Sequence, residues 1–163
     1  MAFRSFRTRL RAFQEVRGDP PDPGFIADLE NLENRDLDLS VRLGAMLAFN
    51  ALLVTIGTHP VSASPGAPLS LDAATQPVLT LASFVALLPL AVSSWFILKA
   101  MLLGEEAEND ELTGEALRVH LFAAFMRSID AQARLLTLAI RATLAGAALT
   151  MVVWGVILAG KMG

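Results

Sequence analysis

Four basic side chains repeat every seven residues in the last third of the chain: His120, Arg127, Arg134 and Arg141. Seven residues in an α-helix rotate a side chain by two turns less about 20°, so all four are expected on one helix face. With a rise of about 1.5 Å per residue, the row spans roughly 30 Å. Because arginine binds phosphate oxygens through paired N–H donors, the row predicts a site for a phosphate-bearing anion.

Two other interpretations of this basic row stay open. Asp130 is spaced to pair with Arg127 or Arg134, and the acidic stretches 28–38 and 105–115 provide further partners. Clustered basic side chains also attract anionic lipid headgroups. Apolar residues on a different face of the same helix predict packing against a neighbouring helix: Leu121, Phe125, Ile129, Leu135 and Leu136.

Hydrophobic residues make up 54% of the 163 residues and charged residues only 18%, which is unusual for a soluble domain. Three apolar stretches have about the length needed to cross a membrane: residues 43–58, 77–98 and 142–160. We therefore predict an all-α membrane protein with three transmembrane helices. The last helix is expected to begin near residue 110 and to extend from the cytoplasm into the membrane.

The distribution of basic residues predicts the orientation. Residues 1–42 hold seven arginines, residues 59–76 hold no Lys or Arg, and residues 99–141 hold five basic residues. Basic segments stay on the cytoplasmic side, so the N-terminus is expected inside and the C-terminus outside, in the periplasm. Arginine- and alanine-rich usage favours a bacterial inner membrane protein.

We expect two regions: a cytoplasmic N-terminal helical segment over 1–40, and a three-span domain over 41–163 that includes a cytoplasmic helical extension, 105–141. Within the first region, 2–17 and 25–39 read as amphipathic helices separated by the proline-rich sequence 18–24.

The helix over 2–17 carries an apolar stripe formed by Phe3, Phe6, Leu10 and Phe13, with arginines over much of the rest. This pattern is typical of an interfacial anchor that lies in the headgroup region. The other interpretation is a gating helix whose phenylalanines close the mouth of a pore.

Polar and small residues inside the spans are candidates for a pore lining or a subunit interface. Asn50 lies in the middle of the first span, and polar groups at that depth face other helices or water. Gly146 and Thr150 belong to a small-xxx-small pattern that permits close helix contact. Pro89 predicts a kink, with Ser93 and Ser94 near the freed carbonyls.

We expect no enzyme activity, cofactor or metal. The chain has no cysteine and only two histidines, His59 and His120, which are predicted on opposite sides of the membrane. It contains no glycine-rich phosphate loop, HExxH motif or plausible Ser-His-Asp set.

Residues 37–57 and 125–158 resemble the three-span effectors of bacterial anti-phage nucleotide-signalling systems, of the Pycsar and Hailong types. The matching positions are Asp38, Arg42 and Asn50, then Arg134 and Arg141, although Pycsar effectors more often have lysine where this chain has Arg42.

The resemblance implies a homo-oligomeric channel, with a tetramer as the favoured assembly, that depolarises the inner membrane of an infected cell. It implies gating by an anionic nucleotide or short single-stranded oligonucleotide, contact with membrane lipids, and a nucleotide-synthesising enzyme from the same operon as partner. Two competing hypotheses are a non-catalytic accessory subunit of a larger inner-membrane complex and a lipid-binding scaffold.

Overall fold

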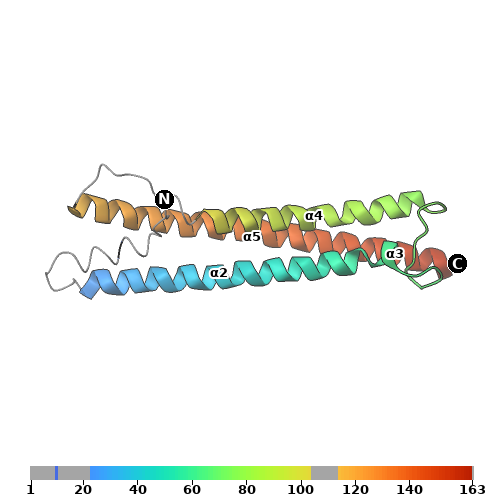
Figure 1. The fold of residues 1–163 in the computed structure, drawn as a ribbon, viewed down its shortest axis with the longest axis horizontal. Coiled ribbons are helices and arrows are strands. Elements are labelled where there is room, and N and C mark those ends of the chain that lie inside the picture. The colour runs from blue at the N-terminus through green and yellow to red at the C-terminus, as the bar shows by residue number, and fades with distance from the viewer. Residues whose placement is uncertain (1–9, 11–22, 104–113, 163) are drawn as a thin grey trace. The chain divides into compact units, whose positions relative to one another are not determined.

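The structure is a computed structural model that describes Leu10, residues 23–103 and residues 114–162. Over these ranges the chain is helical, without a β-strand, and its elements are α2 (Pro23–Gly57), α3 (His59–Ser62), α4 (Pro77–Leu102) and α5 (Gly114–Met162) (Figure 1). Three of them, α2, α4 and α5, are long and apolar enough to cross a membrane. The prediction of an all-helical protein with three membrane-length helices is confirmed.

The helix α2 is continuous where the sequence suggested a cytoplasmic helix followed by a separate span. Its first residue is Pro23, a good first helical residue because its missing N–H needs no partner there. No further proline follows before Gly57, and the helix continues through the two glycines in between, Gly24 in its first turn and Gly44. The expected helix over 2–17 lies outside the described residues, except for Leu10.

The helix α4 continues through Pro89. Pro89 lacks the backbone N–H that would donate a hydrogen bond to the carbonyl of Val85, four residues earlier. Ser93 and Ser94 were expected near this freed carbonyl, but among the described residues neither serine donates a hydrogen bond to it. Ser94 donates instead to the carbonyl of Leu90, and Ser93 bonds to other helices.

The chain forms two compact units. Unit 1 comprises residues 1–43 and 98–136, and unit 2 comprises residues 44–97 and 137–163. The long helices α2 and α5 each contribute one part to each unit, and α4 belongs mostly to unit 2.

In unit 1, buried residues on α5 recur at spacings of three and four, the pattern of a helix with one packed face, and α2 contributes three buried leucines. The buried residues of this unit from these two helices are Leu29, Leu39, Leu43, Leu121, Phe125, Ile129, Gln132 and Leu136. The predicted apolar face of the last helix is therefore confirmed at four positions, while Leu135 is half-buried.

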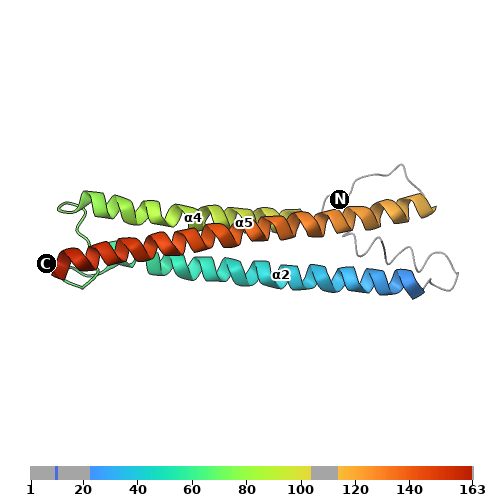
Figure 2. The same ribbon diagram turned by 180° about the vertical axis from the view of Figure 1, so that it is seen from behind.

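In unit 2, the segments of α2, α4 and α5 lie side by side, as both views show (Figures 1 and 2). Buried residues of α4 alternate at spacings of three and four: Ser83, Ala86, Leu90, Ser93 and Ile97. This seven-residue repeat is the geometry of helices that cross at a small angle.

The connection between α2 and α4 is held by local hydrogen bonds within unit 2. The backbone N–H of Leu71 donates to the carbonyl of Pro60 at 2.8 Å. At the end of α5, Lys161 Nζ donates to the carbonyl of Ala67 at 2.9 Å and to Ser70 Oγ at 3.2 Å. The last turn of α5 is thereby tied to this connection.

The apolar stretches of the three long helices are mostly uncovered by the chain itself. Their most apolar windows are only 17%, 28% and 17% buried for α2, α4 and α5. An apolar surface of this extent needs lipid or other subunits to cover it.

Candidate functional site: a basic face, a polar layer and a pocket

The basic row lies on the face of α5 opposite its packed side. If the heptad is lettered so that Phe125, Gln132 and Ala139 take position d and Ile129, Leu136 and Thr143 take position a, every member of the row takes position f. Position f points away from the a/d seam. Arg127, Arg134 and Arg141 are accordingly exposed and His120 is half-buried.

The arginines of this row form no ion pair among the described residues. Arg127 Nε donates to the carbonyl of Ala123, on its own helix, at 3.3 Å. Asp130 pairs instead with Arg35 of α2, at 3.5 Å, and both side chains are 62% exposed. The predicted pairing of Asp130 with a member of the row is therefore not what the structure shows.

The acidic residues of α2 do not neutralise the row within the described residues either. Asp38 pairs with Arg42, four residues later on the same helix, at 2.8 Å. Since exposed pairs of this kind contribute little free energy, their role is mainly to distribute charge. Within unit 1, the outward charge of Arg127 and Arg134 thus stays available to an external anion.

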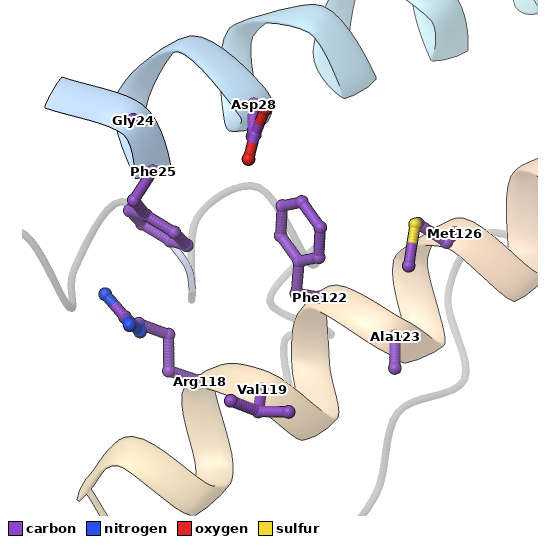
Figure 3. Close-up of a pocket in the computed structure, with 8 residues that line it drawn as sticks. All are labelled: Gly24, Phe25, Asp28, Arg118, Val119, Phe122, Ala123 and Met126. Carbon is purple, nitrogen blue, oxygen red and sulfur yellow. The ribbon is translucent and has the colours of Figure 1, made fainter. Parts of the chain in front are cut away.

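A pocket of about 400 Å³ lies in unit 1, on the side of α5 that faces α2 (Figure 3). It lies between the first turns of α2 and the first turns of α5. The described residues that line it are Gly24, Phe25, Asp28, Arg118, Val119, Phe122, Ala123 and Met126. The centroids of the Phe25 and Phe122 rings are 6.1 Å apart, with a tilt of 45° between the ring planes.

Arg118 lines the pocket, although it was not among the residues predicted to form a site. It lies one heptad before Phe125, in register with the apolar face of α5, and its side chain is only 29% exposed. Its guanidinium lies 4.6 Å from the centroid of the Phe25 ring and pairs with Glu115. An arginine in phase with an apolar stripe was the sequence signal for this site.

A buried polar layer joins the three helices of unit 2. Asn50 of α2 and Ser93 of α4 are fully buried, and Thr143 of α5 is 2% exposed. Asn50 Nδ2 donates to Ser93 Oγ at 2.8 Å, and Thr143 Oγ1 donates to Asn50 Oδ1 at 2.7 Å. Ser93 Oγ lies 2.8 Å from Thr143 Oγ1, which closes a ring of three side chains.

The ring satisfies its own polar groups. When Ser93 donates to Thr143, each side chain donates to the next in one direction. Ser93 also lies 2.9 Å from the carbonyl of Ala139, and its single proton serves one of these acceptors at a time. Asn50 was predicted to line a pore or an interface; the structure places its amide within the chain, on partners from two other helices.

Gly146 and Thr150 also face the chain's own helices. A Cβ added to Gly146 would lie 2.8 Å from the Leu90 side chain and 3.3 Å from its backbone nitrogen. Thr150 Oγ1 donates to the carbonyl of Gly146 at 2.9 Å, and its methyl group lies 3.6 Å from the Cβ position of Gly57. This small-residue pattern serves packing of α5 against α4 and α2.

Of the predicted gating stripe, only Leu10 is described; it is helical and fully buried. Phe3, Phe6 and Phe13 lie outside the described residues. Among the described residues, no group of three or more His, Asp or Glu side chains is arranged to hold a metal ion.

No protein-family model matches the chain, and neither a curated protein nor a solved structure matches it significantly.

Proposed function

We propose that the chain is a homo-oligomeric ion channel of the bacterial inner membrane, gated by an anionic nucleotide or short oligonucleotide. In this proposal the N-terminus is cytoplasmic, and several copies bring their α5 helices around a central axis. The observation that carries the proposal is the exposed basic face of α5, whose arginines have no ion-pair partner among the described residues.

The continuity of α5 supplies the coupling that gating requires. One helix, Gly114–Met162, carries the basic face in its first half and an apolar span in its second half. Arginines from several copies would repel one another around an axis, and an anion bound between them would remove that repulsion. Binding would therefore favour one arrangement of the α5 helices over another.

The exposed apolar surface supports assembly within a bilayer. In the three membrane-length helices, exposed apolar residues include Leu52, Leu81, Leu88, Leu144 and Val152. Lipid and neighbouring copies would share this surface. The favoured tetramer is one closed ring that a head-to-tail contact can form.

The decisive experiment follows membrane potential with a dye in bacteria that express the protein with and without its neighbouring genes. The variants are wild type, Arg127→Glu/Arg134→Glu, and Lys99→Glu as a charge-reversal control at an exposed position outside the row. We expect depolarisation that requires the neighbouring genes, persists in the control and is lost in the double variant. A steady potential in all strains, despite normal insertion, would reject the channel.

A second measurement separates a soluble ligand from a lipid. Purified protein in vesicles of zwitterionic lipid is titrated with short single-stranded DNA at two salt concentrations. We expect ion flux to respond at lower DNA concentration in low salt, because release of counterions from phosphates drives such binding. A response that needs anionic lipid, and not DNA, would assign the basic face to headgroups.

The mass of the purified assembly tests the competing hypothesis of an accessory subunit. A channel is expected to purify alone as a small ring in native mass spectrometry. A monomer, or a complex with larger proteins at fixed stoichiometry, would favour the accessory subunit instead.

A further inference from the structure

We infer that the pocket between the starts of α2 and α5 is a binding site for a small organic cation: an amine attached to an aromatic or branched apolar body. The inference does not depend on the channel proposal, since it uses neither the basic row nor assembly. It follows from the distribution of charge and apolar surface around the pocket (Figure 3).

The pocket already contains one positive charge, that of Arg118. Arg118 pairs with Glu115, and the central carbon of its guanidinium lies over the Phe25 ring, 4.6 Å from the ring centroid. Glu115 compensates the charge of Arg118 and accepts a hydrogen bond from its Nη2. An anionic ligand would therefore compete with Glu115 for this arginine.

The pocket also contains a negative charge, that of Asp28. Asp28 lines the pocket and points toward the space between Phe25 and Phe122 (Figure 3). It has no hydrogen bond or ion pair among the described residues, unlike Arg118. The group in the pocket that lacks a partner is therefore a carboxylate, and its complement is a cationic N–H donor.

One wall of the pocket is apolar. Phe122, Val119 and Met126 present an aromatic ring, a branched aliphatic chain and a thioether on one side of the pocket. A volume of about 400 Å³ lies within the usual range for small-molecule sites. Where an aromatic ring lies beside a carboxylate, an organic cation is attracted both to the π face of the ring and to the negative charge of the carboxylate.

The test uses three probes of similar shape and different charge: benzylamine, benzyl alcohol and benzoate. The full chain is placed in nanodiscs of zwitterionic lipid, and binding is followed by saturation-transfer difference NMR with empty nanodiscs subtracted. We expect benzylamine to bind most tightly, benzyl alcohol more weakly and benzoate least.

The variants Asp28→Asn and Glu30→Gln separate the pocket carboxylate from general surface charge. Both residues are exposed and near the start of α2, but only Asp28 lines the pocket. We expect Asp28→Asn to lower the affinity for benzylamine about three- to fivefold, as for the loss of a partly exposed ion pair. The affinity for benzyl alcohol should not change. Glu30→Gln should leave benzylamine binding unchanged.

Each other outcome overturns the inference. Absence of benzylamine binding would show that the pocket holds no such ligand. Equal binding of benzylamine and benzyl alcohol, or an unchanged Asp28→Asn variant, would remove the role of the carboxylate. Tightest binding of benzoate would make Arg118 the recognition residue. Circular dichroism of the variants checks that their helix content is intact.

Discussion

Asn50, Ser93 and Thr143 show how single polar side chains set the packing of unit 2. A hydrogen bond between helices inside a membrane contributes a modest free energy, because the separated helices also find partners. The ring of three side chains has a larger effect than a single hydrogen bond between two helices, because it holds three helices in one register. A slip of any helix would leave a buried donor or acceptor unpaired, which costs more than the bond contributes.

Replacing Asn50 with alanine is expected to lower the free energy of unfolding by about 1–2 kcal/mol, the cost of lost interhelical hydrogen bonds and a small cavity. Unfolding in mixed micelles by titration with sodium dodecyl sulfate measures this change. The matched control is Thr55→Ala, because the exposed Thr55 hydroxyl bonds only the carbonyl of Ala51 on its own helix. Equal losses for both variants would show that the ring has no special role.

Within the helix α5, different sides carry different kinds of residue. The a/d side packs against the chain's own helices, and position f carries the basic row. The same position f continues after Arg141 with Ala148 and then Gly155, both exposed. A single helix thus presents a charged outer face in one half and a smooth apolar outer face in the other.

Gly146 and Gly155 differ only in which side of α5 they occupy, and this predicts opposite effects of alanine. At Gly146 the added methyl would overlap the Leu90 side chain, whereas nothing lies within 4 Å of the position at Gly155. Overpacking costs about 1–3 kcal/mol, while alanine itself favours a helix by about 1 kcal/mol. We expect Gly146→Ala to be destabilised relative to Gly155→Ala by about 2 kcal/mol.

The same micelle titration compares the two glycine variants. Identical unfolding midpoints would mean that α4 and α5 are not packed closely at Gly146. A less stable Gly155→Ala would instead indicate a helix contact on the outer face of α5.

At the scale of the whole molecule, the apolar exterior predicts contact with lipid tails. Trp95 is 66% exposed on α4, whereas Trp154 on α5 is half-buried and its indole N–H is buried without a hydrogen-bond partner among the described residues. In vesicles that contain brominated lipid, we expect the fluorescence of Trp95 to be strongly quenched and that of Trp154 to be less affected.

Two single-tryptophan variants, Trp154→Phe and Trp95→Phe, separate the two signals. Weak quenching of Trp95 would place its face of α4 against another subunit. Equal quenching of both residues would show that Trp154 also reaches lipid, contrary to its half-buried position.

The sequence alone determined the helical class, the three membrane-length segments and the single face that holds the basic row. These properties depend on composition and on spacing along one helix, both of which are local. The apolar positions of the last helix were predictable for the same reason, since a period near 3.6 residues determines the buried face.

Which residues become partners depends on how the helices pack against one another. Asp130 pairs with Arg35 rather than with its neighbours on α5, Asn50 bonds Ser93 and Thr143, and Asp28 shares a pocket with Arg118. Each of these contacts joins residues from different helices. Their identity depends on which helices lie side by side and in what register, and periodicity within a single helix carries no information about either.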